Sequence, residues 1–545
     1  MGTRSRLFLS SALVLLPLLP LTVRLARLQV FEHKSLELKA SDEFSRDSVE
    51  VVPRADILDR NGNVLAQSLP VWIAFADKRM IRDIRPLAGK LARLLNLPAE
   101  EIVRRYERGG RRTAELRRDL DYAQSQALAR AKIAGIGIES SQRRFYPNGD
   151  LGRALLGRVG SDGRGISGIE LSLNSRLSGR PRLYKLIRDG TGKIVARSLV
   201  KDSPEPQALT LTIDRNFQFI AEEALADAGK RFKATRGVAA IQDPLTGELL
   251  ALASYPISPL NNPAVQDVYE PGSTFKIVAA AAALDQGVID EKQTIFCENG
   301  TWSIAPGTTI HDHEPEGALT LAGILQHSSN IGAAKLGERL GPERFYRYAR
   351  AFGFGGKTGV DLPGETAGEL RGLPQLTRVA LGASSYGYGV AVSALQMVDA
   401  YSAIANGGLL YAPKLIEDGE PPARLRRVAS ADTMRRLSLM LEGVVDKGTG
   451  QSAGIPGYRI AGKTGTARRI DPKTHRYSTH QYNASFVGFL PASRPRWTIL
   501  VVLENPRGAY YGAEVAAPVF ARIARQLLVL DGIAPDKPQT VAAAP

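Results

Sequence analysis

A serine and a lysine three residues apart, Ser273 and Lys276, open an apolar stretch that ends near Gly287. In a helix, residues three apart lie on one face, one turn from each other. A serine hydroxyl needs a nearby base to act as a nucleophile. A lysine among apolar neighbours can supply that base, because desolvation favours its neutral form. Since a helix start also offers free N–H groups to an oxyanion, this spacing predicts Ser273 as a nucleophile and Lys276 as its base.

A second polar motif spans residues 328–330 (Ser-Ser-Asn) and follows a helical-looking stretch at residues 321–326. The hydroxyl of Ser328 can relay a proton between the lysine and a leaving group, and the amide of Asn330 can hold a substrate amide. We therefore predict that Ser328 is catalytic and that Asn330 binds substrate.

The third motif spans residues 463–466 (Lys-Thr-Gly-Thr). It follows residues 458–461, which alternate like a strand, and precedes a second predicted strand at residues 484–489. Gly465 lets a substrate backbone approach closely, and an edge strand can pair with an extended peptide. Lys463 offers a positive charge to a substrate carboxylate, so this motif predicts a peptide-binding edge.

Each motif is weak when taken alone, because short motifs arise by chance. Ser198 and Lys201 repeat the first spacing, but residues 202–206 (Asp-Ser-Pro-Glu-Pro) follow them, so no helix can continue there. A second Lys-Thr-Gly, at residues 357–359, lies among glycines and prolines and is predicted to be a loop. The order and local context of the three motifs together predict one catalytic centre.

The elements that must carry these motifs belong to a chain of 545 residues, which is too long for one ordinary core, so two or more domains are expected. Residues 80–134 predict helices. Residues 209–213 and a hairpin over residues 238–253 predict strands. Residues 203–206 indicate a hinge, and the Pro/Ala-rich tail from residue 532 is predicted to be disordered.

An apolar run over residues 7–23 follows Arg4 and Arg6. As a helix it would reach about 25 Å, slightly short of a bilayer core, and Leu25 and Leu28 can extend it. A cleaved signal peptide is the alternative. No small-x-small cleavage site follows the run, which favours an uncleaved anchor. The flanking charges do not set its orientation.

The chain carries a net charge of +16 and one cysteine, Cys297. The charge indicates an anionic neighbourhood or a solvated basic surface; no nucleic-acid-binding module is recognisable. A single cysteine allows no intrachain disulfide and no cysteine metal cluster. His475 and His480 lack further metal ligands nearby and are predicted to be surface residues. We expect neither a metal nor a cofactor.

Together these motifs resemble the penicilloyl-serine transferase superfamily, and specifically the class B penicillin-binding proteins. The resemblance extends over nearly the whole chain. One departure is Ala55, where the family usually has glycine. Matching segments are residues 24–33, 53–62, 168–170, 243–248, 361–365 and 405–408.

The resemblance implies a mechanism. Ser273 attacks the D-Ala-D-Ala carbonyl of a peptidoglycan stem peptide, Lys276 is the base, and an amine from a neighbouring stem resolves the acyl-enzyme. The backbone N–H groups of Ser273 and Thr466 form the oxyanion hole. Lys463, Thr464 and Thr466 hold the terminal carboxylate. β-Lactams acylate Ser273.

The resemblance also implies an α+β architecture, in which a transpeptidase domain with an antiparallel sheet flanked by helices follows an elongated N-terminal pedestal. A single-pass anchor places the catalytic domain outside the cytoplasm at the bacterial inner membrane. The implied partners are peptidoglycan stem peptides and β-lactams, the cytoplasmic membrane, and other membrane proteins of cell-wall synthesis or division, such as a lipid II polymerase. The implied segments are a cytoplasmic tail (1–6), the anchor (7–28), a dimerisation-type pedestal (29–205), the transpeptidase domain (206–531) and a disordered tail (532–545).

The second motif and residues 386–389 (Tyr-Gly-Tyr-Gly) are similar to those of the septal, division-specific branch. Two alternatives remain: a D,D-carboxypeptidase or serine β-lactamase, in which water resolves the acyl-enzyme, and a catalytically silent division scaffold. A bifunctional polymerase is disfavoured, because the region between anchor and catalytic domain is tight for a glycosyltransferase domain.

Overall fold

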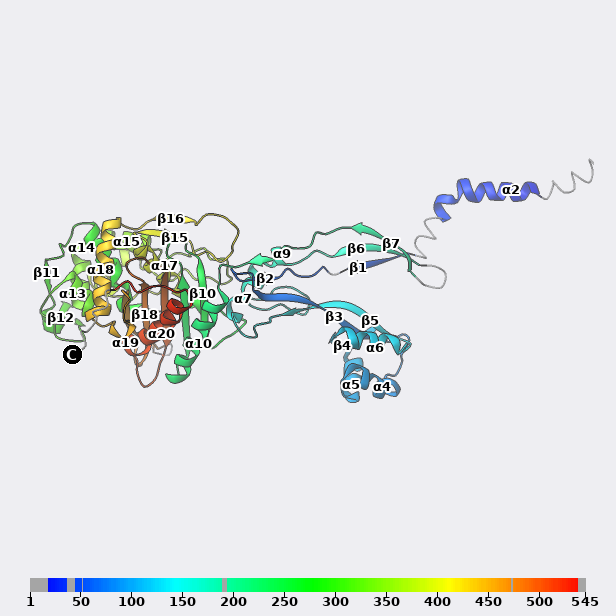
Figure 1. The fold of residues 1–545 in the computed structure, drawn as a ribbon, viewed down its shortest axis with the longest axis horizontal. Helices are drawn as coiled ribbons and strands as arrows, with labels where there is room; N and C mark the ends of the chain where they lie inside the picture. Colours follow the sequence, from blue (N-terminus) through cyan, green and yellow to red (C-terminus); the bar gives the residue numbers. More distant parts are fainter. Residues whose placement is uncertain (1–17, 37–44, 51, 189–193, 472–473, 538–545) are drawn as a thin grey trace, which may run out of the picture. The chain divides into compact units, whose positions relative to one another are not determined.

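The chain folds into two compact units (Figure 1). The structure, a computed structural model, describes residues 18–36, 45–50, 52–188, 194–471 and 474–537. Unit 1 comprises Met1–Arg54, Pro70–Gln142 and Ser178–Pro206, and unit 2 comprises Ala55–Leu69, Arg143–Leu177 and Gln207–Pro545.

The N-terminal apolar region is described from residue 18 onward. Leu18–Ala26 form helix α2, and Arg27–Phe31 form a π-helical turn. The predicted cytoplasmic tail and residues 7–17 of the predicted anchor lie outside the described residues. Among the residues that are described, no helix combines the length and the apolar character needed to cross a membrane.

Unit 1 contains a small helical and sheet assembly where the sequence predicted helices throughout. The prediction over residues 80–134 is wrong at β4 (Thr113–Leu120), which pairs with β3 (Val64–Asp77). In β4, Ala114 and Leu116 are buried while Thr113 and Glu115 are exposed, which is the two-residue period of a strand. The other elements are α4 (Arg85–Leu95), α5 (Ala99–Arg108), α6 (Tyr122–Arg130) and β5 (Ile136–Phe145), which also pairs with β3.

Unit 1 also contains a three-stranded antiparallel sheet. Its order is β1 (Ser45–Glu50), β6 (Arg182–Arg188) and β7 (Ile194–Lys201). Ser198 and Lys201 lie in β7, so this copy of the first motif is not helical, as predicted.

Unit 2 is built on a five-stranded antiparallel sheet, and its α+β class agrees with the prediction. The predicted hairpin over residues 238–253 is confirmed as β9 and β10. The sheet order is β10 (Leu249–Tyr255), β9 (Arg236–Gln242), β19 (Trp497–Glu504), β18 (Tyr477–Leu490) and β17 (Ala461–Ile470), which makes β17 an edge strand.

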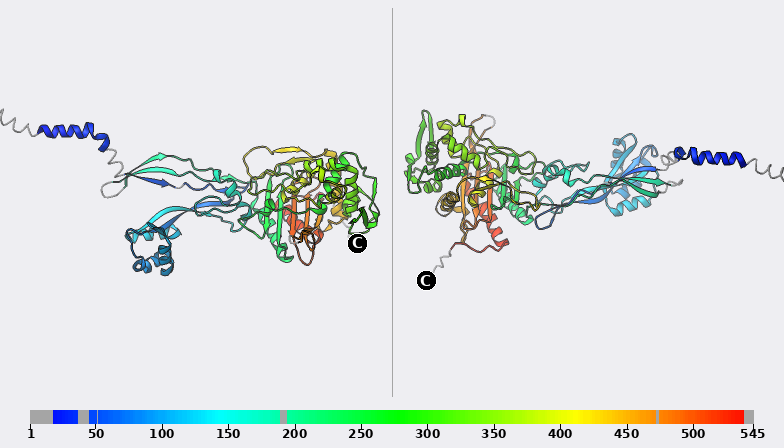
Figure 2. Two further views of the ribbon diagram at one scale, coloured as in Figure 1. Left: turned by 180° about the vertical axis from the view of Figure 1, so that it is seen from behind. Right: turned by 90° about the horizontal axis from the view of Figure 1, so that it is seen from above.

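Helices cover both faces of this sheet (Figure 2). Because successive side chains of a strand point to opposite faces, Ala239 and Ile241 pack in the core with α10 (Arg215–Arg231) and α20 (Ala517–Leu530). Val238 and Ala240 pack in the opposite core, which contains α12 (Lys276–Asp285), α17 (Ala394–Ala405) and α18 (Ala431–Lys447).

Two segments that precede residue 207 complete the core of unit 2. Strand β2 (Ile57–Leu58) pairs in parallel with β8 (Leu209–Thr210). Ile57, Leu155 and Ile169 are buried in the same core as α12. The smaller elements nearer the catalytic motifs are η2 (Gly272–Phe275), β11 (Thr294–Phe296), β12 (Thr301–Ala305), β13 (Thr308–His311), β14 (Ala318–Thr320), α13 (Leu321–Gln326), α14 (Asn330–Leu340), α15 (Pro342–Ala351) and α16 (Arg378–Ser385).

The region before the third motif differs from the prediction. Residues 458–460 are not a strand, and β17 begins at Ala461 and contains the motif itself. The preceding residues bond to the C-terminal segment instead of a ladder: the Tyr458 hydroxyl donates to the Ile533 carbonyl (2.6 Å) and the Arg459 N–H to Asp536 (2.7 Å). Ile533 and Asp536, which lie in the tail predicted to be disordered, therefore make hydrogen bonds; residues 538–545 lie outside the described residues.

Candidate active site

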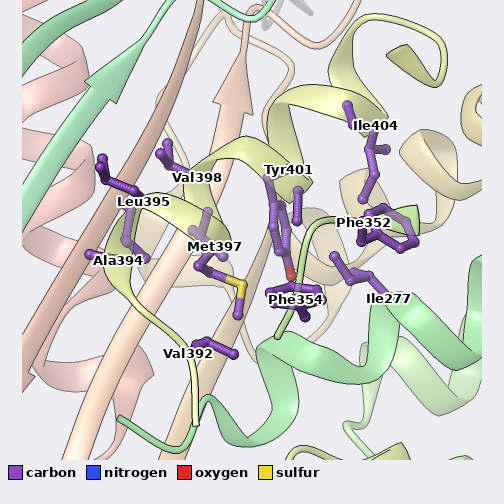
Figure 3. Close-up of a cluster of buried hydrophobic side chains, with 14 of the residues drawn as sticks. Ile277, Phe352, Phe354, Val392, Ala394, Leu395, Met397, Val398, Tyr401 and Ile404 are labelled. Atoms are coloured by element: carbon purple, nitrogen blue, oxygen red, sulfur yellow. The ribbon is translucent and has the colours of Figure 1, made fainter. Parts of the chain in front are cut away.

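Ser273 lies in η2, the short 3₁₀ turn that leads directly into α12. The turn begins at Gly272, whose φ of +53° is a conformation that favours glycine. The buried hydroxyl of Tyr401, on α17, donates to the Thr274 carbonyl at 3.0 Å. Figure 3 shows the Tyr401 ring reaching from α17 into an apolar cluster beside Phe354. Packing against α17 and one buried hydrogen bond thus hold the nucleophile segment in place.

Lys276 occupies the first turn of α12, and its side chain is only 1% exposed. Its Nζ lies 3.0 Å from Ser273 Oγ, 3.1 Å from Ser328 Oγ and 2.9 Å from Asn330 Oδ1. Burial, and next the neighbouring charge of Lys463, lower the pKa of Lys276 well below its ordinary value. The amine is therefore positioned and predisposed to accept the Ser273 proton, as the sequence predicted.

The second motif joins α13 to α14, and the structure brings it against Lys276. Ser328 has a φ of +60°, and its hydroxyl accepts a hydrogen bond from Lys276 Nζ at 3.1 Å. Asn330 points its amide oxygen at Lys276 and donates from Nδ2 to the His311 carbonyl (3.0 Å). Both predicted residues therefore lie at the candidate site, held between two helices.

Asp312 braces the second motif and was not predicted. Its carboxylate accepts hydrogen bonds from the Ser329 hydroxyl (2.5 Å) and from the backbone N–H groups of Asn330 and Ile331, the latter at 3.0 Å. These N–H groups form the start of α14, where a carboxylate is electrostatically favoured. No spacing rule links residue 312 to this motif, because the contact is tertiary.

Lys463 lies in β17, and its side chain is fully buried. Its Nζ donates to Ser328 Oγ at 3.0 Å, so the Ser328 hydroxyl lies between the amines of Lys276 and Lys463. Burial lowers the pKa of Lys463 to about 7. Near neutral pH this side chain can therefore be either a charged ammonium or a neutral amine.

The remaining residues of the third motif also belong to β17. Thr464 Oγ1 lies 2.9 Å from the hydroxyl of Thr449, a neighbour that the sequence did not indicate. The hydroxyl of Thr466 accepts the Gly512 N–H (2.9 Å). A Cβ on Gly465 would lie 2.8 Å from the Pro271 carbonyl oxygen, so only glycine lets β17 approach the nucleophile turn this closely.

Other chemistry-bearing residues lie away from this centre. The Lys-Thr-Gly copy is a loop in which the N–H groups of Thr358 and Gly359 donate to Glu365. In the part of the chain that the structure describes, one group could hold a metal ion: Glu314, Glu316 and His327, with ligand atoms within 4.8 Å of one another. His475 and His480 are not in that group.

The assembled groups suit acyl transfer through a serine ester. A hydroxyl, a buried amine and a second hydroxyl lie in hydrogen-bonding sequence from Ser273 through Lys276 to Ser328. An activated serine at a helix start, next to an edge strand, can attack a carbonyl, and backbone N–H groups there can stabilise the resulting oxyanion.

Comparisons with known proteins agree with this geometry. Residues 237–525 match the family model described as the penicillin binding protein transpeptidase domain, and residues 49–208 match the penicillin-binding protein dimerisation domain. The chain is 33% identical to the probable peptidoglycan D,D-transpeptidase PbpC of Pseudomonas aeruginosa, over 98% of this chain and 96% of the relative. It is 33% identical to the peptidoglycan D,D-transpeptidase FtsI of Escherichia coli, over 96% and 91%.

Solved structures give the same result. Penicillin-binding protein 3 of Mycobacterium tuberculosis, complexed with aztreonam, matches with a TM-score of 0.69 and 28% identity, over 90% of this chain and 99% of that one. The transpeptidase domain of Burkholderia pseudomallei penicillin-binding protein 3 is 36% identical and covers 60% of this chain and 98% of that one, with a TM-score of 0.57. The chain belongs to the class B penicillin-binding proteins, with a dimerisation domain followed by a transpeptidase domain.

Proposed function

We propose that this protein is a peptidoglycan cross-linking D,D-transpeptidase that acts through an acyl-enzyme on Ser273. The observation that carries the proposal is that the three motifs meet at one centre: Ser328 of the second motif accepts hydrogen bonds from Lys276 of the first (3.1 Å) and from Lys463 of the third (3.0 Å). Lys276 Nζ contacts Ser273, Ser328 and Asn330 at 2.9–3.1 Å. Family membership supports the same reaction class.

In acylation, neutral Lys276 takes the Ser273 proton while Oγ attacks the carbonyl of the penultimate D-alanine. The backbone N–H groups of Ser273 and Thr466 stabilise the oxyanion. The C–N bond to the terminal D-alanine breaks, and Ser328 passes a proton from Lys276 to the departing amine. The products are a seryl ester and free D-alanine.

In the second half-reaction an acceptor amine attacks the ester and loses a proton. The new amide forms as the bond to Ser273 Oγ breaks, and Oγ recovers a proton through Lys276. Asn330, Thr464, Gly465 and Thr466 align the donor peptide along β17. Lys463 adjoins the terminal carboxylate and the Ser328 relay.

We also propose a role in septal wall synthesis, with residues 7–28 as a single-pass anchor and the catalytic domain outside the cytoplasm. The Tyr-Gly-Tyr-Gly run at residues 386–389 supports the septal assignment. A lipid II polymerase in the same membrane is the expected partner. Depletion in the native bacterium should give undivided filaments; rounded cells would instead indicate elongation.

Labelled penicillin tests the reaction. We expect one stable adduct per chain, located by mass spectrometry on the peptide that contains Ser273, and none with Ser273→Ala. Ser198→Ala is the matched control, because Ser198 has the same Ser-x-x-Lys spacing but lies in β7. This control should label like the wild type. Rapid loss of the label would indicate a β-lactamase, and no label a silent scaffold.

A donor pentapeptide supplied with an acceptor amine separates the remaining cases. Formation of a new amide product is expected. Release of D-alanine without that product would assign a carboxypeptidase and overturn the transpeptidase proposal.

A further inference from the structure

The assembly of α4, α5, α6 and β4 in unit 1 (Figure 1) ends in three connecting segments that lie together. Backbone hydrogen bonds join them. The Asp77 N–H donates to the Gly135 carbonyl (2.8 Å), and the Lys78 N–H donates to the Arg112 carbonyl (2.9 Å). The surface that they form is here named the turn surface, and it comprises residues 78–82, 108–112 and 131–135.

The turn surface is strongly basic. Its three segments contain seven lysines and arginines and no acidic residue. Five of these cations are exposed and make no ion pair with any residue that the structure describes. They are Arg82, Arg108, Arg111, Arg112 and Lys132. This surface therefore presents positive charge that the protein itself leaves uncompensated.

The carboxylates that flank the turn surface already have partners. Asp77 forms an ion pair with Arg79 at 2.6 Å, and Glu107 forms one with Arg85 at 3.1 Å. Asp83 accepts the backbone N–H of Arg85 at 3.0 Å. These acidic groups are thus engaged beside the surface and do not pair with its five exposed cations.

An apolar side chain projects among these charges. Met80 is 65% exposed, whereas its neighbour Ile81 is buried. The buried Tyr106 hydroxyl donates to the Ile81 carbonyl. Lys78 Nζ donates to the Gly109 carbonyl at 2.9 Å and lies 4.9 Å from the centre of the Tyr106 ring. Packing and hydrogen bonds beneath the surface therefore hold Met80 outward.

Exposed cations around one exposed apolar side chain fit an anionic bilayer. Lipid phosphates attract the guanidinium and ammonium groups, while an apolar side chain enters the boundary between headgroups and acyl chains. A soluble anionic polymer would satisfy only the charges and would leave Met80 in water. The combination of both features thus favours a membrane surface over a dissolved polyanion.

A tether makes a weak contact of this kind sufficient. The proposed anchor at residues 7–28 belongs to the same chain, so the bilayer that holds it is presented to the turn surface at a high effective concentration. Each lysine or arginine close to an anionic bilayer strengthens binding about fivefold. Several such residues can therefore keep the surface docked without the affinity that a free protein would need.

We propose that the turn surface docks on anionic lipid headgroups of the membrane that holds the anchor, with Met80 entering the interface. This inference rests on the single-pass anchor of the proposed function. Docking gives unit 1 a second attachment to the bilayer, one that depends on lipid charge and weakens as salt screens it.

The test places a fluorophore at the centre of the turn surface. Full-length protein labelled at Met80→Cys is reconstituted into vesicles of phosphatidylcholine, alone or with about one third phosphatidylglycerol, and quenching by nitroxide-labelled lipid reports contact. The one native cysteine, Cys297, is buried and does not compete for the label. We expect the equilibrium constant for lipid contact to be at least about tenfold higher with phosphatidylglycerol, and to fall at high ionic strength.

Two double variants with equal net charge separate this surface from a general charge effect. Arg111→Glu with Arg112→Glu should bring lipid contact down to the level seen in phosphatidylcholine alone. Arg344→Glu with Arg424→Glu removes two exposed arginines of unit 2, from α15 and from the strand Arg424–Arg427, and should retain the wild-type contact. Penicillin labelling should be unchanged in both variants, because neither touches the catalytic centre.

Equal lipid contact in the two kinds of vesicle, or unchanged contact in the Arg111→Glu, Arg112→Glu variant, would overturn the inference while leaving the proposed transpeptidase intact. Binding of soluble polyphosphate without any lipid contact would assign the surface to an anionic polymer and would overturn it as well. A chain that alkaline carbonate extracts from the vesicles would instead contradict the proposed anchor, and with it this inference.

Discussion

At the residue scale, the chemistry depends on the Ser328 hydroxyl, which links the amines of Lys276 and Lys463. Ser328 Oγ accepts from both Lys276 and Lys463, at 3.1 and 3.0 Å. Two buried amines cannot both stay charged at this distance, because each loses hydration and repels the other. The centre therefore favours a neutral Lys276 and gives Ser328 a proton donor on either side.

Replacing Lys276 by arginine should remove the base while keeping a positive charge at this position. Because a guanidinium does not lose its proton in proteins, we expect the second-order rate of penicillin acylation to fall about 10²- to 10⁴-fold. Assays in which the labelling reaction is quenched at set times measure this rate. Far-UV circular dichroism is the control for folding, and a folded variant with the wild-type rate would contradict the assigned base.

The lowered pKa of Lys463 predicts a pH dependence of stability. Its folded pKa is about 7, whereas a free lysine titrates near 10.4. Between these values the unfolded chain binds more protons than the folded one, so the free energy of unfolding should rise with pH from about 7 to 10. Lys463→Met should show a smaller rise. Urea unfolding at pH 7 and pH 9.5 measures this rise in the wild type and in the variant. Equal rises in the two proteins would exclude a lowered pKa of Lys463.

At the scale of elements, the centre depends on how α14 begins. Asp312 satisfies the first N–H groups of this helix and the hydroxyl of Ser329. We expect Asp312→Ala to lower the free energy of unfolding by about 1–2 kcal/mol. It should also slow acylation of Ser273, because Ser328 and Asn330 lose their support. Thermal unfolding and penicillin labelling test both effects; acylation at the wild-type rate would assign Asp312 a purely structural role.

The approach of β17 to η2 gives a second prediction at this scale. A Cβ at residue 465 would lie 2.3 Å from Ser485 Oγ and 2.8 Å from the Pro271 carbonyl, so Gly465→Ala must push the strand from the nucleophile turn. We expect acylation to fall by at least about tenfold, because complete loss of one oxyanion donor costs about 10²- to 10³-fold and the displaced strand loses part of that stabilisation. Gly89→Ala, in α4 with no atom within 4 Å of its Cβ, is the control and should leave acylation unchanged.

Some elements and site residues could be predicted from the sequence, and others could not. Ser273 and Lys276 were recognisable because a helix converts a spacing of three into a contact. Asp312 and Thr449 were not, since their partners are distant in sequence and no local pattern marks them. Strand β4 was taken for helix because charged residues interrupt its apolar alternation. The boundary of β17 was misplaced because residues 458–459 bond to the C-terminal segment.

At the scale of the whole molecule, the core of unit 2 does not begin at residue 207. Ile57, Leu155 and Ile169 are buried in it, each with at most 1% exposure, and the Gly152 N–H donates to the buried Glu222 of α10 at 2.9 Å. Segments 55–69 and 143–177 therefore belong to the catalytic unit.

This organisation predicts the behaviour of a fragment. Residues 207–545 alone should still label with penicillin, since every predicted site residue is present. Their melting temperature should be lower than that of the catalytic unit in the full chain, by at least about 5 °C, because several apolar side chains lose their partners. Calorimetry of both proteins measures the difference; equal melting temperatures would show that the two early segments add no stability.

The pairing of β2 with β8 has a consequence for biosynthesis. Ile57 is made early, but its strand partner Leu209 follows about 150 residues later, a delay of roughly 10–30 s at ordinary ribosome speeds. During that interval the early strand has no neighbour on that edge, while the assembly formed by α4, α5, α6 and β4 is already complete in sequence. Unit 2 therefore cannot complete its fold until its last strands have been made. The nascent chain needs protection from aggregation until then.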